Sequence, residues 1–237
     1  MSLVAPVPHE TSLAKGEGRG ARNWPQRLRW DWVWTALTVI ILGGAVVRFA
    51  GGSWGLPLDL NSDESVIVQG AIDMAKRHSF EPPYFFRPDH VEMQLSNLAY
   101  LAYSHLLHGS SPQSLYASDP APFILISRTI TACFGVAMIV VAYLIGKRFT
   151  VAIGVMAAFV VAFFPPFVDN SHFASPDVPL SFAFMIVILA CMRYLASPSW
   201  GNLLLASFGV SFAIAIKYPG ALGALMIAIT EIGRAHV

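Results

Sequence analysis

The segment "VWTALTVIILGGAVVRFAGG", residues 33–52, is a continuous apolar run that carries a single charged side chain. A helix needs about 20 mostly apolar residues to cross the hydrocarbon core of a bilayer, and this run is long enough. The whole chain has a similar character, because 55% of its 237 residues are hydrophobic and only 12% are charged. An ordinary soluble domain carries about 25% charged residues. The composition therefore predicts an all-α fold, a polytopic bundle of transmembrane helices, and the absence of a basic stripe gives no reason to expect nucleic acid as a partner.

Further apolar runs predict where the other spans lie. Clear spans are expected at 32–51, 123–146, 151–168 and 178–196. A fifth apolar region, 203–230, is interrupted by "KYPG", and it is either one kinked span or two spans that meet at this break. Backbone groups freed by such a break at membrane depth must be satisfied by protein or lie near water.

The segment "VEMQLSNLAYLAYSHLLH", residues 91–108, is the ambiguous run of the chain. It is short and carries several polar side chains, while its apolar residues recur at helical spacing. This pattern is typical of a helix that lies on the membrane surface rather than of a span. We therefore expect an extracytoplasmic juxtamembrane helix here.

Basic residues indicate the orientation of the spans. Residues 1–31 are polar and basic, and we expect them to form a disordered cytoplasmic tail rather than a cleaved signal peptide. If the surface helix does not cross, Lys147 and Arg148 also face the cytoplasm, as the positive-inside rule favours. The outer loop 52–122 and the turn 167–180 then lie together on the extracytoplasmic side.

The last seven residues, "EIGRAHV" at 231–237, directly follow an apolar run. Their spelling is similar to that of a translated sequencing adaptor, which is a known scar of assembled short reads. We therefore expect 231–237 to be a non-native tail and give these residues no part in a mechanism.

The segment "LDLNSDESVIVQGAIDMAKRHSF", residues 58–80, places two adjacent carboxylates, Asp63 and Glu64, beside the first span. Ser62 is a suitable N-cap, and carboxylates in a first helical turn suit the helix dipole. The apolar residues that follow are expected on one helix face: Val66, Ile67, Gly70, Met74 and Phe80. By spacing alone, the segment is either a capped interfacial helix with no further role or a helix that presents a catalytic carboxylate.

Four other polar residues are candidates for a binding site, and each also has an ordinary structural interpretation. They are Arg128, His172, Asp177 and Lys217. Arg128 is suited to a phosphate or to anchoring a helix end, Asp177 to a helix start, and Lys217 to a lipid headgroup. An ionisable residue in a membrane segment is nevertheless a functional candidate by default. Carboxylate oxygens are suitable ligands for a divalent cation, although nothing in the spacing requires one, and no other cofactor is indicated.

Several of these segments, in their order along the chain, resemble one family of membrane enzymes. They are "SDE" at 62–64, "RPDHVEMQLSNLAYLAYSHLL" at 87–107, "SRTITACFGVAMIVVAYLIGKRF" at 127–149, "SHFASPDVPLSFAFMIVILACMRYL" at 171–195 and "GVSFAIAIKYPGAL" at 209–222. Together they resemble the GT-C class of glycosyltransferases, and within it the bacterial family 39, relatives of protein O-mannosyltransferases and of the aminoarabinose transferase. The resemblance covers roughly residues 30–230, so the chain is expected to hold, at 32–230, the N-terminal part of a longer GT-C transmembrane domain. The common Lys-Pro-Pro-Leu segment of the family is here Arg87-Pro88-Asp89-His90, which leaves the subfamily and the acceptor open.

The resemblance implies a reaction and roles for these residues. It implies a hexosyl- or pentosyltransferase in the bacterial inner membrane that moves a sugar from a polyprenyl-phosphate donor to a hydroxyl of a lipid, glycan or protein at the extracytoplasmic face. Asp63 matches the family's general base in an inverting transfer, which requires hydrogen-bond reach of the hydroxyl. Glu64 would orient the acceptor or a cation. Arg128, Lys217 and His172 would contact the lipid phosphate, whose charge grows as it leaves, and Asp177 would be a second polar residue of the site.

Two other functions remain open at this level. A transporter or flippase for a lipid-linked or anionic substrate would also place charges at membrane depth, although we find no clear internal repeat of the kind that transporters often have. A non-catalytic membrane scaffold is the third alternative. Downstream sequence with more spans and an outer domain would favour the enzyme, and an inverted copy of these spans would favour the transporter.

Overall fold

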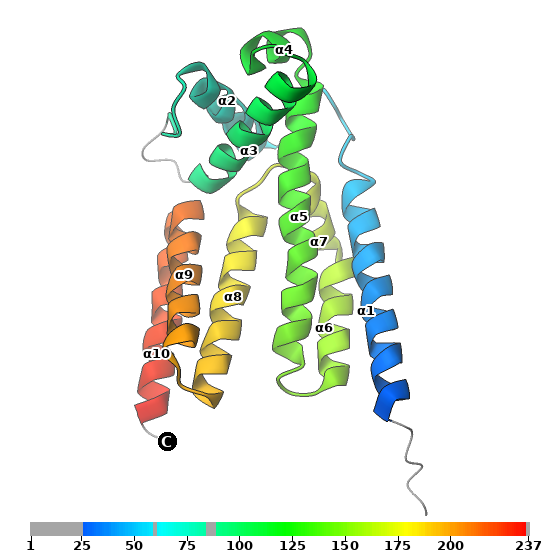
Figure 1. Ribbon diagram of the computed structural model, residues 1–237, viewed down its shortest axis with the longest axis vertical. Coiled ribbons are helices and arrows are strands. Elements are labelled where there is room, and N and C mark those ends of the chain that lie inside the picture. Colours follow the sequence, from blue (N-terminus) through cyan, green and yellow to red (C-terminus); the bar gives the residue numbers. More distant parts are fainter. Residues whose placement is uncertain (1–25, 59–60, 84–88, 236–237) are drawn as a thin grey trace, which may run out of the picture.

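The computed structural model describes residues 26–58, 61–83 and 89–235, and within these ranges the regular elements are all helical (Figure 1). Six helices form the body of a bundle: α1 Gln26–Phe49, α5 Ala121–Gly146, α6 Val151–Phe163, α8 Asp177–Ala196, α9 Trp200–Ile216 and α10 Gly223–Ala235. Three more gather at one end of it: α2 Ser62–Lys76, α3 His90–Ala102 and α4 Pro112–Ser118. The predicted all-α membrane bundle is confirmed.

In the described part of the chain, three helices are long and apolar enough to cross a bilayer: Trp32–Phe49 within α1, Ala121–Gly146 and Asp177–Ala196. They agree with three of the predicted spans. The first helix begins earlier than expected, at Gln26, so residues 26–31 belong to it and not to the tail. Residues 1–25, the remainder of the predicted tail, lie outside the described residues.

The predicted span at 151–168 is not one straight helix. Helix α6 ends at Phe163, and the short helix α7, Pro165–Asp169, continues through the 3₁₀ turn Asn170–His172 at an angle of 58°. The physical reason is the Pro165-Pro166 pair, which has no backbone N–H groups and so cannot continue the hydrogen-bond ladder of α6. A bent pair of helices can still count as one broken span, which would be the fourth.

The interrupted region 203–230 forms two helices that fold back on each other (Figure 1). The chain reverses in the 3₁₀ turn Tyr218–Leu222, where a Cβ atom on Gly220 would lie 2.1 Å from the carbonyl carbon of Ala213. This close approach explains why the reversal needs glycine. Of the expected non-native tail, residues 231–235 continue α10, and residues 236–237 lie outside the described part.

The interior of the bundle is built from small and aliphatic side chains. One buried cluster joins α1, α5 and α6 and includes Leu37, Ile139 and Ala162. At the hairpin between α5 and α6, a Cβ on Gly146 would lie 2.8 Å from the Cα of Gly154, so both helices approach through glycine. Small residues at such contacts let helix backbones pack closely without a water-driven hydrophobic effect.

Helices α2 and α3 pack on each other across the end of the bundle (Figure 1). A Cβ on Gly70 would lie 2.7 Å from the sulfur of Met93, which defines their close contact. The predicted apolar face is confirmed for Ile67, Gly70 and Met74, which are buried, but Phe80 is 57% exposed and lies outside the helix. The predicted cap was also wrong by one residue, because Asn61 accepts the hydrogen bond from the Asp63 amide and Ser62 is the first helical residue.

The predicted helix at 91–108 is divided into α3 and a π turn, Tyr103–Leu107. It lies across the bundle end and does not meet the criteria of a span. The start of α1 and the α5–α6 turn with Lys147 and Arg148 lie at the opposite end (Figure 1). The basic segments and the acidic helix α2 are thus separated by the length of the bundle.

Candidate active site

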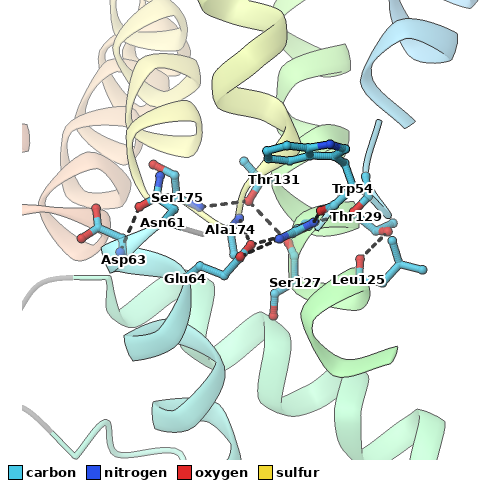
Figure 2. A network of polar contacts seen from close by, with 12 residues as sticks. Trp54, Asn61, Asp63, Glu64, Leu125, Ser127, Thr129, Thr131, Ala174 and Ser175 are labelled. Carbon is cyan, nitrogen blue, oxygen red and sulfur yellow. Dashed lines mark hydrogen bonds and ion pairs between the residues drawn. The ribbon is translucent and has the colours of Figure 1, made fainter. Parts of the chain in front are cut away.

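A buried ion pair joins α2 to α5 (Figure 2). Arg128 donates from Nε to Glu64 Oε1 and from Nη2 to Glu64 Oε2, each at 2.7 Å. Both side chains are almost fully withdrawn from solvent, at 2% and 0% exposure. Parallel bonds of this kind are strong and directional, so the pair fixes the first turn of α2 against α5.

The remaining guanidinium nitrogen of Arg128 binds the segment that follows α1. Nη1 donates to the carbonyl oxygens of Gly52 at 2.9 Å and Trp54 at 2.7 Å. Arg128 therefore connects α5, α2 and the chain leaving α1. This arrangement differs from the expected contact with a lipid phosphate, because each guanidinium nitrogen already donates to a protein oxygen.

Glu64 is likewise engaged on both oxygens, each of which accepts a hydrogen bond from the protein. Its Oε1 also accepts from the backbone amide of Ala174 at 3.1 Å, which holds the turn before α8 against α2. Asp63, the neighbouring carboxylate, is only partly buried. Figure 2 shows the two side chains diverging, with Glu64 directed toward α5 and Asp63 away from it beside Asn61. The Arg128–Glu64 ion pair, called the clamp below, and the cap by Asn61 thus fix the backbone that carries Asp63.

A second buried carboxylate, Glu92 of α3, lies next to this clamp. The hydroxyl of Thr131 donates to its Oε1, and the amide of Ser175 reaches the same hydroxyl at 3.4 Å. Its Oε2 has no hydrogen-bond partner among the described residues. Burial, and secondarily the negative charges of Asp89 and Asp63, raise the pKa of Glu92 to about 8, although the Thr131 hydrogen bond opposes the shift. Glu92 is therefore predominantly protonated at neutral pH.

Two of the candidate residues form a solvent-accessible ion pair between the start of α8 and the end of α9. Lys217 Nζ donates to Asp177 Oδ1 at 2.8 Å, and the side chains are 28% and 57% exposed. Partial burial acts to lower the pKa of Lys217, but the hydrogen bond and charge of Asp177 and further carboxylates raise it. Those further carboxylates are Asp63 and Asp89. The amide of Asp89 also donates to the Ile216 carbonyl at 2.8 Å, which brings α3 to the end of α9.

His172 lies at the same end of the bundle but faces α1. Its Nε2 is 2.8 Å from the carbonyl oxygen of Val47, and a Cβ on Gly51 would lie 2.8 Å from the ring. The candidate residues therefore fall into three groups: the buried clamp, the accessible Asp177–Lys217 pair, and His172 against α1.

The described residues contain no group of three or more His, Cys, Asp or Glu side chains that could hold a metal ion. Glu64, an expected cation ligand, has both oxygens occupied by Arg128. The donor set in the described part of the chain therefore does not fit a divalent cation.

Sequence reasoning did not single out Glu92 or Arg48, a buried arginine in the last turn of α1. Glu92 stood inside a segment interpreted only as a surface helix. Arg48 is 1% exposed and donates to carbonyl oxygens of α6. Two features of the sequence could have pointed to this contact: the charge of Arg48 within one apolar run and the Pro-Pro pair within another. Nothing in the sequence, however, indicates that these two runs lie against each other.

The bundle of apolar helices, with a charged cluster at one end, defines a multi-pass membrane protein whose polar site lies where the spans meet the surface helices. The chain belongs to the dolichyl-phosphate-mannose-protein mannosyltransferase family, whose sequence profile matches residues 69–234. It is thus a membrane glycosyltransferase, which favours the enzyme over the transporter. The match begins after Asp63 and Glu64, and residues 84–88, which include Arg87 and Pro88, lie outside the described residues. Comparisons with curated proteins and with solved structures give no match.

Proposed function

We propose that the protein transfers a sugar from a polyprenyl-phosphate donor to an acceptor hydroxyl, with inversion, at the extracytoplasmic face of the membrane. The carboxylate of Asp63 takes the hydroxyl proton while the acceptor oxygen forms a bond to the anomeric carbon. The bond between that carbon and the phosphate oxygen breaks, and the polyprenyl phosphate leaves with the electron pair. The family match favours mannose as the sugar.

The observation that carries the assignment of Asp63 is its place beside a buried, immobilised neighbour. Glu64 is locked by Arg128, and the Asp63 amide is capped by Asn61, so the backbone that carries Asp63 is held at a defined position while the residue stays partly accessible. A general base needs this combination of fixed geometry and access to the substrate. Glu64 and Arg128 act in this proposal as positioning residues.

Lys217 is the cation best placed for the donor phosphate. Its ammonium is accessible and carries its charge beside Asp177, whereas the donors of Arg128 are used within the protein. A positive charge near the leaving phosphate stabilises the charge that develops in the transition state. His172, which contacts α1, and Asp177 are proposed to shape the rim of the site.

The charge distribution supports the proposed orientation. The start of α1 and the basic α5–α6 turn share one bundle end, which the positive-inside rule assigns to the cytoplasm. The opposite end, with α2 and α3, is then extracytoplasmic, where a lipid-linked donor would meet Asp63.

The test is sugar transfer by the full-length enzyme with Asp63→Asn. Asparagine has nearly the same shape but cannot accept the proton, so transfer should fall by about 10²–10⁴-fold, the usual contribution of a general base. Asp73→Asn is the matched control, because Asp73 is an exposed carboxylate on the other face of α2. Transfer from a polyprenyl-phosphate mannose is measured at equal membrane expression, and near-normal turnover of Asp63→Asn would remove the catalytic assignment.

A further inference from the structure

Arg48 is a buried cation without a buried acid. Its side chain is 1% exposed in the last turn of α1, and no carboxylate among the described residues forms an ion pair with it. Its two terminal nitrogens donate to backbone carbonyls: Nη1 to Ala162 at 2.8 Å and to Gly44 at 3.0 Å, and Nη2 to Val161 at 2.7 Å, whereas Nε has no hydrogen-bond partner among the described residues. An arginine near a helix end usually extends to the membrane surface, but this one is directed into the bundle.

The two carbonyls on α6 are the ones that lack their normal helical donors. In an α-helix the carbonyls of Val161 and Ala162 would accept from the amides of residues 165 and 166. Those residues are Pro165 and Pro166, which have no N–H. Unsatisfied carbonyls are costly at membrane depth, and Arg48 donates to both.

The space that Arg48 occupies is kept open by α5. A Cβ on Gly135 would lie 2.8 Å from Arg48 Nε and 2.5 Å from Ser171 Oγ. The guanidinium is therefore enclosed by α1, α5 and α6 at the point where the α6–α7 bend begins.

The segment after this bend leads directly to the clamp. His172 contacts the Val47 carbonyl, next to Arg48 in α1, and Ala174 donates its amide to Glu64. A change in the bend would move the turn at 173–175 relative to the first turn of α2. Arg48 is thus linked to Asp63 through the backbone that it holds.

We propose that Arg48 is a positioning residue: by donating to the two carbonyls freed by Pro165 and Pro166, it sets the α6–α7 bend and so places the Ala174 amide on Glu64. The structural part of this proposal stands without the assigned reaction, and its effect on catalysis rests on the proposed function.

The first test is a double-mutant cycle on the thermal stability of the full-length enzyme in detergent. Arg48→Met should lower the melting temperature by several degrees, because two carbonyls are left without donors. The pair Pro165→Ala and Pro166→Ala restores both N–H groups, so adding Arg48→Met to it should cause a much smaller loss. Arg193→Met, at an exposed arginine near the other end of α8, is the control and should have little effect.

The second test measures position rather than stability, by amide hydrogen exchange. Arg48→Met should raise exchange in a peptide covering 170–176 while leaving α9 unchanged, and Arg48→Lys, which keeps donors, should partly restore protection. Transfer by Arg48→Met should show a kcat lower by roughly 10- to 100-fold with little change in the donor KM, since misplacement affects geometry more than binding.

Equal stability losses from Arg48→Met in the proline and alanine backgrounds, or unchanged exchange at 170–176, would overturn the proposal. If Arg48→Met does not accumulate, the triple variant with both alanines must accumulate, and its failure would overturn the proposal equally. These stability and exchange results do not depend on activity. Failure of the Asp63 assignment would therefore be seen separately, as normal transfer by Asp63→Asn.

Discussion

Two arginines are buried at the same end of the bundle, and they are satisfied in opposite ways. Arg128 of α5 meets a carboxylate from α2, so its charge is neutralised within the protein. Arg48 of α1 meets only backbone carbonyls, which stay neutral whether it is present or not. Arg128 forms an ion pair, whereas Arg48 donates to carbonyls of α6 that the proline pair leaves without backbone donors.

The difference shows that a buried arginine in a membrane bundle does not by itself indicate anion binding. In both cases the terminal guanidinium nitrogens donate to protein oxygens, and in both cases the contact fixes a segment that leads to Asp63. The clamp fixes the start of α2, and Arg48 fixes the turn that meets Glu64. Asp177 and Lys217, in contrast, form an ion pair that stays accessible to solvent.

The largest effect should come from breaking the clamp. Removing one member of a buried ion pair leaves an uncompensated charge and costs about 3–5 kcal/mol. Arg128→Met should therefore destabilise the full-length protein more than Arg48→Met, which leaves only neutral carbonyls unpaired. Glu64→Gln should be similarly severe, and combining it with Arg128→Met should cost less than the sum, because no lone charge remains.

The measurement is thermal unfolding in detergent for the two single variants, the double variant and Arg48→Met, all at one pH and lipid content. Additive losses in the double variant would show that the two side chains do not depend on each other. A larger loss for Arg48→Met than for Arg128→Met would reverse the proposed ranking of the two sites.

The sequence predicted those features that depend on local pattern. Composition and run length are sufficient to predict the bundle and three spans, since bilayer thickness sets the length of a helix. The apolar spacing after Asp63 predicts the buried face of α2. These inferences need no knowledge of which helices meet.

What the sequence could not predict depends on contacts between distant segments. Glu64 and Arg128 were each assigned to substrate, because nothing at either position indicates that they pair across 64 residues. The Pro165-Pro166 pair was contained in a run long enough to span, so its hydropathy concealed the break. Arg48 acquires its role only when α1 lies against that break.

Glu92 extends the comparison of the two arginines, because it is another buried ionisable group and has no ionic partner among the described residues. Burial raises its pKa to about 8, from an ordinary value of 4.5, so the folded state retains a proton that the unfolded state loses between these values. The contribution of this proton to the free energy of unfolding is fully present below about pH 4.5 and is lost as the pH rises through about 8. Glu92→Gln, which is neutral at every pH, should remove this part of the pH dependence.

The melting temperature of the wild type, compared with that of Glu92→Gln, should therefore fall as the pH is raised from about 5 to about 9, a range chosen from the two pKa values. Glu81→Gln is the matched control, because it makes the same chemical change at an exposed position. Parallel profiles for wild type and Glu92→Gln would show that Glu92 is ionised in the folded protein.

The smallest effect on stability should come from the exposed pair, which has the same kind of contact as the clamp but keeps its access to water. Asp177→Asn should change the free energy of unfolding by about 0–1 kcal/mol, because surface ion pairs are screened and pay side-chain entropy. The variant should act instead on the donor, since it frees the Lys217 ammonium that we propose to contact the phosphate. We therefore expect a changed donor KM that becomes less distinct from wild type as salt is raised, because salt screens accessible charges. Melting temperature and donor KM, measured at low and high salt, separate the two effects. A stability loss as large as that of Arg128→Met would mean that exposure does not distinguish the two pairs, and an unchanged KM at low salt would remove Lys217 from the phosphate site.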